Sequence, residues 1–526
     1  MKLFSAFATV GVLTLVSRIL GFARDILIAG ALGTGGVADA FFVAFRFPNL
    51  FRRLFGEGAF NAAFVPMYAR KLEGDGAAAA DRFASRAMGG LVLVLVVLSA
   101  IAMLAMPWLM LVLAPGFAGD PAKYDLAVTL TQIAFPYLLC MSLVALLSGA
   151  LNAHHRYWAA AAAPILLNVI LIVAISVAIA SGFAGQPGAG FVLAVGVAIA
   201  GLGQLVLLWL AMRAARLKIR LGMPRYDDDM RRLVKLGIPG LIAGGITQIN
   251  IVVGTIIASL QAGAVSYLYY ADRLYQLPLG IVGIAIGVVL LPELARQLRS
   301  GDRARALDTQ NRSLEFALLL TLPSAVGLSF AAYPIISVLF ERGAFTAADT
   351  PATANALIAF ALGLPAFVLI KVFQPAFFAR EDTATPMRFA AVNLVVNVVG
   401  SLALFFAFTA NGASGHIGIA LATSIAGWVN ALLLWRRLAR DGAFTPDRRL
   451  VRACLAAVAA SAVMAGVLWQ GVPLAEPWLV AGQPILIRAA ALTAIIAVAG
   501  GIYGVIVLGT GALRLSHLRR SRAAGE

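Results

Sequence analysis

The most constraining feature of this chain is a succession of apolar segments, each about as long as a helix that crosses a bilayer. A membrane helix needs about 20 apolar residues to cross the hydrocarbon core. Of the 526 residues, 61% are hydrophobic and 12% are charged, whereas soluble domains carry about 25% charged residues. A soluble enzyme and a nucleic-acid-binding protein are therefore poor fits, and we expect an all-α polytopic membrane protein.

The apolar segments predict about fourteen transmembrane helices. Several of them are long enough to tilt or to project beyond the bilayer. The approximate limits are 7–33, 38–67, 84–113, 124–151, 158–181, 189–212, 233–260, 264–295, 313–340, 350–379, 386–409, 416–435, 453–470 and 483–510.

The distribution of basic residues predicts the orientation. With the N-terminus placed inside, 31 of the 41 Lys and Arg lie in cytoplasmic loops or termini, while only Lys123 and Arg342 lie in outer loops. Such an excess of Lys and Arg marks cytoplasmic loops, so we expect both termini in the cytoplasm. This topology explains the formal charge of +17 without nucleic acid, and the basic cluster at 213–235 is placed to touch anionic membrane lipids.

The sequence also matches itself, with a nearly constant offset between the first and the second copy. Matching positions are Val65, Pro66, Ala69 and Arg70 against Leu291, Pro292, Ala295 and Arg296. Because six predicted spans separate the copies, both copies have the same orientation. This predicts two parallel, pseudo-symmetric six-helix bundles plus two C-terminal helices, an arrangement in which transporters bind substrate between the halves near mid-membrane.

The repeat sets the expected domain limits. We expect an N-terminal six-helix lobe at 1–222 and a C-terminal six-helix lobe at 227–440. The two additional helices occupy 449–512, and a basic cytoplasmic tail follows at 513–526.

Ionisable residues inside the spans carry the functional signal. One central Arg costs roughly 2.5–3.5 kcal/mol on insertion scales, so several facing lipid would be prohibitive. They must face a wet or internally paired interior. The candidate substrate-binding residues are Arg18, Arg24, Arg52 and Arg273, and the supporting cavity or gate residues are Ser17, Asp25, Asp39, Arg53, Glu57, Tyr269, Asp272, Gln276 and Lys371.

The chemistry of arginine indicates the substrate class. Its planar guanidinium makes paired, charge-assisted hydrogen bonds to phosphate, so an arginine-lined cavity favours an anionic substrate. With a helical rise of about 1.5 Å per residue, Arg18 and Arg52 lie at one depth, and Arg24 and Arg273 lie at a shallower one. If the first, second and eighth spans line one cavity, these four form a column through it.

Internal ion pairs are the alternative for some of these charges. For Arg46, Arg53 and Glu57 we favour such pairs. Lys371 is open between a cavity cation and a residue whose ammonium reaches the membrane surface, and we interpret Arg488 as an anchor at the membrane interface.

No catalytic or metal-binding pattern stands out. The two cysteines, Cys140 and Cys454, lie far apart in apolar segments and suggest neither a disulfide framework nor a metal site. The outer loops are short and nearly uncharged, which argues against a membrane-bound glycosyltransferase. We therefore expect a transporter rather than an enzyme or a scaffold, with no metal and no cofactor.

The same charged segments resemble the motifs of the MurJ (MviN) family of lipid II flippases. The resemblance extends from the first predicted span through at least the twelfth. It is carried by the runs Ser17-Arg18-Ile19-Leu20-Gly21-Phe22-Ala23-Arg24-Asp25, Asp39-Ala40-Phe41-Phe42-Val43-Ala44-Phe45, Pro48-Asn49-Leu50-Phe51-Arg52-Arg53-Leu54-Phe55-Gly56-Glu57-Gly58-Ala59-Phe60, Tyr269-Tyr270-Ala271-Asp272-Arg273-Leu274, Phe340-Glu341-Arg342-Gly343-Ala344-Phe345 and Phe378-Ala379-Arg380-Glu381-Asp382 with Pro386.

The resemblance implies the fold of the MOP exporter superfamily and a function in peptidoglycan synthesis. It implies movement of lipid II across the bacterial inner membrane by alternating access. It also implies central-cavity roles for Arg18, Arg24, Arg52 and Arg273 and an important role for Asp39. The resemblance further implies that the two helices at 449–512 form a groove for the polyprenyl tail. Some family members have a sodium site with an acidic residue in the seventh span, but 233–260 here contains no Asp or Glu.

Several properties stay open at this stage. Another polyprenyl-diphosphate-linked oligosaccharide, such as an O-antigen unit, would use the same arginines. The sequence leaves open whether membrane potential or a coupling ion drives the cycle, and whether cell-wall synthesis proteins bind the chain. We expect a monomer.

Overall fold

The structure is a computed structural model that describes residues 2–51 and 60–512. Within these ranges it is helical, and the only extended pairing is a single bridge between Arg342 and Phe345. The chain divides into two compact units. Unit 1 contains Met1–Ser266 and Arg342–Phe345, and unit 2 contains Tyr267–Glu341 and Thr346–Glu526.

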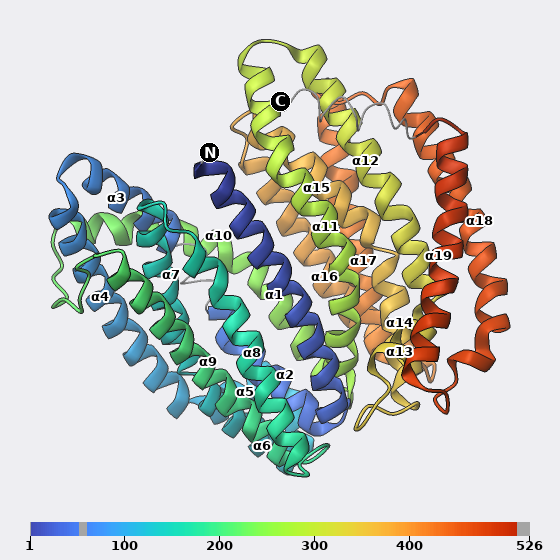
Figure 1. The fold of residues 1–526 in the computed structure, drawn as a ribbon, viewed down its shortest axis with the longest axis horizontal. Coiled ribbons are helices and arrows are strands. Elements are labelled where there is room, and N and C mark those ends of the chain that lie inside the picture. The colour runs from blue at the N-terminus through green and yellow to red at the C-terminus, as the bar shows by residue number, and fades with distance from the viewer. Residues whose placement is uncertain (1, 52–59, 513–526) are drawn as a thin grey trace. The chain divides into compact units, whose positions relative to one another are not determined.

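Within the described residues, unit 1 contains ten α-helices and one short 3-10 helix. They are α1 (Lys2–Leu32), α2 (Gly36–Phe51), α3 (Phe60–Gly74), α4 (Ala77–Leu104), α5 (Met106–Leu113), η2 (Pro115–Gly119), α6 (Pro121–Ala134), α7 (Tyr137–Ala153), α8 (Trp158–Ala180), α9 (Pro187–Ala214) and α10 (Asp228–Ser259). In this unit α1 packs along α8, and α8 packs along α9 (Figure 1).

Unit 2 contains nearly all of α11 and every later helix. They are α11 (Ala264–Arg299), α12 (Arg303–Phe330), α13 (Ala332–Phe340), α14 (Asp349–Ala361), α15 (Leu364–Phe378), α16 (Ala384–Ala410), α17 (Gly415–Arg440), α18 (Arg448–Leu479) and α19 (Ile485–Gly509).

The helices have the lengths and compositions of a polytopic membrane protein. Ten helical stretches among the described residues are long and apolar enough to cross a membrane. These ten do not include α1, α2, α10 or α11. The helical membrane fold is confirmed, and the number of fourteen spans stays a prediction.

The internal repeat recurs in the backbone. The helix pair α4 and α5 is interrupted at Ala105, and the pair α12 and α13 is interrupted at Ala331, which is the position that the offset between Val65 and Leu291 predicts. A left-handed residue ends a helix at His155 (φ 58°) and, at the same offset, at Glu381 (φ 63°). Because non-glycine residues rarely adopt this conformation, the agreement supports the two pseudo-symmetric bundles predicted from the sequence.

Proline marks two of the breaks, the one between α4 and α5 and the one between α14 and α15. Because it lacks a backbone N–H, proline is well tolerated in the first helical turn, where that group would have no helical partner. Pro107 lies in the first turn of α5, and Pro365 lies in the first turn of α15. Each therefore begins the second half of a broken span.

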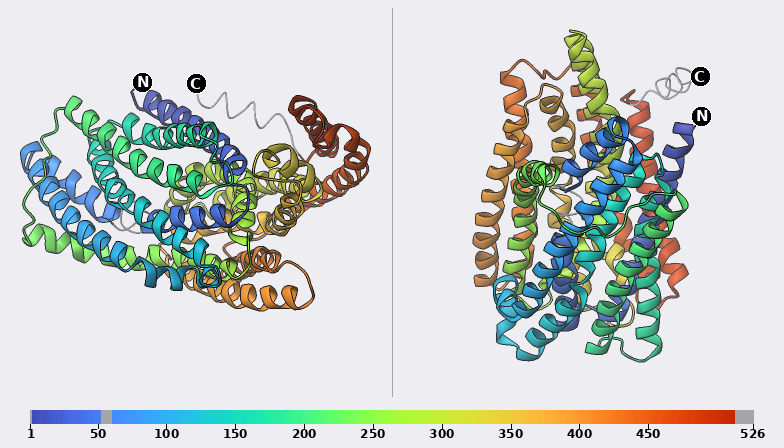
Figure 2. Two further views of the ribbon diagram at one scale, coloured as in Figure 1. Left: turned by 90° about the horizontal axis from the view of Figure 1, so that it is seen from below. Right: turned by 90° about the vertical axis from the view of Figure 1, so that its left-hand side faces the viewer.

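The two C-terminal helices pair with each other and with their own unit. Figures 1 and 2 show α18 and α19 side by side at the red end of the colour scale, and α18 also packs along α12. Their shared core includes Leu319, Met464 and Tyr503. The Tyr503 hydroxyl donates a hydrogen bond to the Leu319 carbonyl at 2.7 Å, which satisfies the polar end of a buried side chain.

The expectation that Arg488 anchors the chain at the membrane interface is corrected by the structure. Arg488 is 4% exposed. Its guanidinium donates to the Ser337 hydroxyl at 2.6 Å and to the Leu479 carbonyl at 3.2 Å, and it lies 3.9 Å from the Glu341 carboxylate. A buried charge needs such partners, so Arg488 joins α19 to α13 within unit 2.

Candidate functional site

The charged motif of α1 forms a buried network in unit 1. The Arg24 guanidinium donates to one Asp25 carboxylate oxygen from Nη2 at 2.7 Å and from Nε at 3.1 Å. Its Nη1 donates to the Asn168 side-chain oxygen at 2.9 Å. Arg24 and Asp25 are only 6% and 2% exposed. Arg24 is thus held in one orientation by a neighbouring acid and by an amide from α8.

Asn168 connects this network to Ser17, at the start of the same motif. Its amide nitrogen donates to the Ser17 carbonyl at 2.8 Å and lies 3.5 Å from the Ser17 hydroxyl. The Arg24 guanidinium also lies 5.8 Å from the centre of the Phe45 ring of α2. The structure therefore brings together Ser17, Arg24 and Asp25.

Arg18 differs from Arg24 in its surroundings. Its side chain is exposed, and within the described residues it makes no hydrogen bond or ion pair. The neighbouring Leu15 and Ile19 are 59% and 60% exposed. Arg18 is therefore a cation on an otherwise apolar stretch, with no protein anion beside it in that part of the chain.

Asp39 is the centre of a second network at the start of α2. The Lys123 ammonium donates to Asp39 Oδ2 at 2.7 Å, and the Gly263 backbone N–H donates to the same oxygen at 2.9 Å. The Ser266 backbone N–H and hydroxyl donate to Oδ1 at 3.0 and 2.6 Å. Asp39 is 0% exposed, and its charge lies at the N-terminus of α11, where unpaired backbone N–H groups favour an anion.

The remaining candidates of α2 fall into two groups. The Arg46 guanidinium donates to the Thr255 hydroxyl of α10 at 3.2 Å, which gives this cation a polar partner inside unit 1. Arg52, Arg53 and Glu57 lie outside the described residues. The predicted column of four arginines and the ion pairs of Arg53 and Glu57 therefore stay predictions.

The candidates of α11 form two local pairs in unit 2. Arg273 Nη2 donates to the Tyr269 hydroxyl at 3.0 Å, and the guanidinium lies 4.7 Å from the centre of that ring. The Gln276 amide donates to the Asp272 carboxylate. The i, i+4 spacing places each pair on one face of the helix.

Lys371 lies on α15 and is exposed. Within the described residues it makes no hydrogen bond or ion pair. Both interpretations of Lys371, a cavity cation and a membrane-surface cation, therefore remain.

Sequence reasoning missed three partners of these candidates. They are Asn168 beside Arg24, Lys123 beside Asp39, and Ser266 at the start of α11. One signal is available for Lys123, because the sequence places Asp39 near the outer end of its span and Lys123 in an outer loop. Opposite charges at one depth indicate a pair.

A short hairpin covers the end of α1 in unit 1. The Ala344 backbone N–H donates to the Gly30 carbonyl at 2.8 Å. A Cβ atom added at Gly33 would lie 2.4 Å from the Ala344 carbonyl oxygen, and Gly33 adopts a φ of +66°. Only glycine accommodates both this conformation and this close approach, so Gly33 fixes how the Arg342–Phe345 segment meets α1.

Comparison with known proteins gives consistent matches. The sequence matches the family model described as "Lipid II flippase MurJ" over residues 28–488. It is 49% identical to the "Probable lipid II flippase MurJ" of Rhizobium meliloti, over 100% of this chain and 97% of that protein. It is 35% identical to the "Lipid II flippase MurJ" of Burkholderia cenocepacia, over 89% of this chain and 90% of that protein.

Solved structures give the same fold. The structure described as "Lipid II flippase MurJ, inward closed conformation" matches with a TM-score of 0.73 and 26% identity, over 94% of this chain and 98% of that chain. An inward-facing MATE family multidrug transporter of the MOP superfamily matches with a TM-score of 0.66 and 13% identity, over 81% and 95%. The second likeness concerns the fold alone.

Proposed function

This chain belongs to the MurJ family of lipid II flippases, and we propose that it moves lipid II from the inner to the outer leaflet by alternating access. The family match over residues 28–488 carries the flippase function. The described residues include ten helical stretches that are long and apolar enough to span a membrane, and the chain is a multi-pass protein of the bacterial inner membrane. The family is a transporter family, and we propose that the chain performs no catalytic step.

The proposed ligand of the arginines is the diphosphate of lipid II. The observation that carries this proposal is Arg18, an exposed cation on an apolar stretch of α1. An arginine facing hydrocarbon would cost roughly 2.5–3.5 kcal/mol, so Arg18 needs water or an anion. A diphosphate supplies acceptor oxygens in the geometry that a guanidinium matches.

Arg24 and Arg273 have a different part in the proposal, because both are oriented before any ligand arrives. Arg24 is held by Asp25 and Asn168, and Arg273 is held by Tyr269. Side chains held in this way lose less conformational entropy when they bind. We assign Arg52 to the same set on the resemblance of its motif.

Asp39 has a proposed role in gating. Its carboxylate holds Lys123 and the N-terminus of α11 together, and the sequence places these segments toward the outer face. We assign this network to the closed outer gate of the transport cycle. We also propose that both termini lie in the cytoplasm, because the distribution of Lys and Arg along the chain predicts this orientation.

Two measurements test whether this chain transports lipid II. Mass spectrometry of lipid that co-purifies with the protein should detect lipid II, whereas recovery of another polyprenyl-diphosphate oligosaccharide instead would overturn the proposal. Expression of the chain should also restore growth to a bacterium depleted of its lipid II flippase, and normal protein levels without growth would count against it.

The driving force and the partners are also part of the proposal. We propose no cofactor, a monomeric protein, and a cycle driven by membrane potential or by a coupling ion. Collapsing the potential with an ionophore while the ion gradients are held separately distinguishes these two sources. An association with cell-wall synthesis proteins stays a prediction for co-purification experiments.

A further inference from the structure

A second cationic feature lies within unit 2, and it contains none of the candidate substrate-binding or gate residues considered above. A cavity of about 510 Å³ is bordered by the end of α11, the start of α12 and the segments that follow α15 and α17. Ligand pockets are commonly about 300–1,000 Å³. The sequence assigns all of these segments to the cytoplasmic side, so the pocket is expected within reach of lipid headgroups and of the cytosol.

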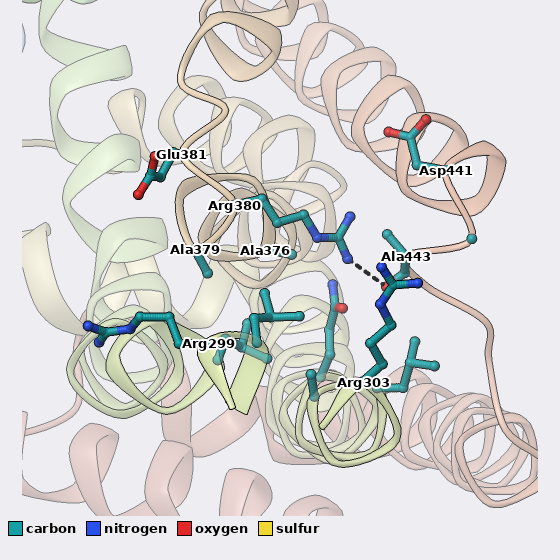
Figure 3. Close-up of a pocket in the computed structure, with 14 residues that line it drawn as sticks. Arg299, Arg303, Ala376, Ala379, Arg380, Glu381, Asp441 and Ala443 are labelled. Atoms are coloured by element: carbon teal, nitrogen blue, oxygen red, sulfur yellow. Dashed lines mark hydrogen bonds between the residues drawn. The ribbon is translucent and has the colours of Figure 1, made fainter. Parts of the chain in front are cut away.

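Two arginines converge in this pocket. Figure 3 shows Arg303 and Arg380 pointing toward the same region near Ala443, while Arg299 points in another direction. Arg380 donates to the Ala443 carbonyl at 3.3 Å. Partial burial lowers the pKa of Arg380, Asp441 raises it, and the charge of Arg303 lowers it. The two guanidiniums thus repel each other at the pocket wall.

Among the described residues, neither acid that lines the pocket forms an ion pair with these two arginines, although Asp441 attracts Arg380. Asp441 is 3.0 Å from the Arg437 guanidinium, which is outside the pocket lining. The carboxylate of Glu381 points away from Arg303 and Arg380 (Figure 3). Within the described residues, neither Arg303 nor Arg380 has an ion-pair partner.

Gln310 gives an independent indication of a ligand. It lines the same pocket and is only 2% exposed. Its side-chain amide nitrogen is buried and has no hydrogen-bond partner. Buried donors are almost always satisfied, so this amide calls for an acceptor from outside the described chain.

The internal repeat shows what a closed version of this corner looks like. The residues of unit 1 that correspond to Leu294, Leu307 and Arg380 in the repeat are Tyr68, Asp81 and His154. The Tyr68 hydroxyl donates to Asp81 at 3.2 Å and lies 3.0 Å from His154 Nε2. Asp81 also accepts from the Lys218 backbone N–H at 2.9 Å.

The two corners differ in their polar side chains. In unit 1 a phenol and a carboxylate fill the space and satisfy each other. In unit 2 both are replaced by leucines, and the pocket is lined by the donors Arg303, Gln310 and Arg380 together with Arg299, Glu381 and Asp441. Because Asp441 is paired with Arg437 and Glu381 points away, the converging donors match an anion with several oxygens.

We propose that this pocket of unit 2 binds a phosphate-bearing anion, with Arg303 and Arg380 as its charge partners and Gln310 as a neutral donor. The shared chemistry is a phosphate group, carried either by an anionic lipid headgroup or by a soluble cytosolic phosphate. The site goes beyond the proposed transport of lipid II, because its residues belong to unit 2 alone and are separate from Arg18, Arg24 and Arg273.

Binding to the purified full-length protein tests the proposal in two arms. Phosphatidylglycerol is added in detergent and followed by native mass spectrometry, and inorganic phosphate is titrated into phosphatidylcholine nanodiscs and followed by calorimetry. We expect binding in at least one arm, and the arm that responds identifies the source. The double variant R303A/R380A should weaken binding by about tenfold or more, because it removes charge-assisted hydrogen bonds.

A second variant tests binding with almost no change in side-chain size, so that a loss of binding is not explained by misfolding. Gln310→Glu places a carboxylate in the pocket that contains Arg303 and Arg380, so it should abolish anion binding and raise the Tm measured without phosphate. Arg388→Ala removes an exposed positive charge outside the pocket, and His154→Ala alters the matching corner of unit 1. Both controls should bind phosphate as the wild type does.

Two results would overturn the proposal. One is the absence of binding in both arms, and the other is binding by Gln310→Glu or R303A/R380A that equals that of the wild type. Neither arm contains lipid II, so these failures are distinguishable from a failure of the proposed transport function.

Discussion

The Lys123 ammonium lies 2.7 Å from the Asp39 carboxylate, in a contact where the two side chains are 9% and 0% exposed. The same ammonium lies 4.0 Å from the centre of the Phe117 ring. A buried pair of this kind is strongly destabilised when only one partner is removed, because the other charge stays desolvated. Single and double substitutions of Asp39 and Lys123 can therefore separate the contribution of this ion pair to stability from its role in gating.

Asp39→Asn and Lys123→Met should each destabilise unit 1 by about 3–5 kcal/mol, the range for breaking a buried ion pair. The double variant should recover a large part of that loss, because no lone charge remains. Thermal unfolding of the purified single and double variants measures this coupling. Asp125→Asn, an exposed acid two residues beyond Lys123, is the matched control and should leave the Tm unchanged.

The gating role makes a separate demand on the double variant. If the ion pair closes the outer gate, the recovered stability should not be accompanied by full transport. If the loss of stability in the double variant equals the sum of the two single-variant losses, the coupling between Asp39 and Lys123 is refuted. A stable double variant with normal transport would refute the role of this ion pair in the outer gate.

Arg18→Ala and Arg24→Ala should fail in different ways. Arg18 is exposed, so its loss should leave the Tm near that of the wild type while growth complementation is lost. Arg24 is buried against Asp25 and Asn168, so its removal leaves a buried carboxylate and should lower the stability by about 3–5 kcal/mol. Tm and protein level, measured beside complementation, separate the two outcomes.

The opposite pattern would count against this assignment. A growth-competent Arg18→Ala protein would remove Arg18 from the substrate site. An Arg24→Ala protein with unchanged Tm would mean that the Asp25 contact is not a stabilising one.

Arg273→Lys tests whether geometry or charge matters on α11. Lysine keeps the positive charge but loses the planar fork and its stacking on Tyr269. We expect transport to fall by about tenfold or more, as for the loss of a charge-assisted hydrogen bond. Tyr269→Phe keeps the ring beneath the guanidinium and should have a smaller effect. Wild-type transport by Arg273→Lys would reject paired hydrogen bonding while leaving a cationic cavity intact.

Gly33→Ala should disturb the contact between α1 and the Arg342–Phe345 segment. The new Cβ would lie 2.4 Å from the Ala344 carbonyl oxygen, at a φ of +66°, and such backbone strain costs about 1–3 kcal/mol. Gly35→Ala is the matched control, because a Cβ there meets nothing within 4 Å. Equal Tm values for the two variants would show that the close approach at Gly33 does not constrain the fold.

The fold class was predictable because it depends on the lengths of the apolar segments and on the positions of the charged residues, which can be read directly from the sequence. Apolar length predicted membrane helices, and the match between Val65-Pro66 and Leu291-Pro292 predicted the repeat that the helix breaks at Ala105 and Ala331 confirm. The limits of the two lobes stay a prediction, because α10 groups with unit 1 by contact and with the second copy by repeat.

The partners of the charged residues were harder to predict. A helical wheel separates faces but not neighbours. Arg18 and Asp25 lie about 20° apart on the wheel, whereas the structure pairs Asp25 with the adjacent Arg24. Asn168 is 144 residues from Arg24, and nothing in the periodicity of α8 indicates that contact. Arg488 was misassigned for the same reason, because its partners Ser337 and Glu341 are distant in sequence.

The most direct measurement of the central claim is the amount of lipid II accessible at the outer face of the inner membrane. A bacterium depleted of its flippase is supplied with this chain or with Arg18→Ala at equal protein level. The account predicts that the wild-type chain restores outer-face lipid II and that Arg18→Ala does not. Failure of the wild-type chain to restore it, or restoration by Arg18→Ala to the same level, would contradict the account.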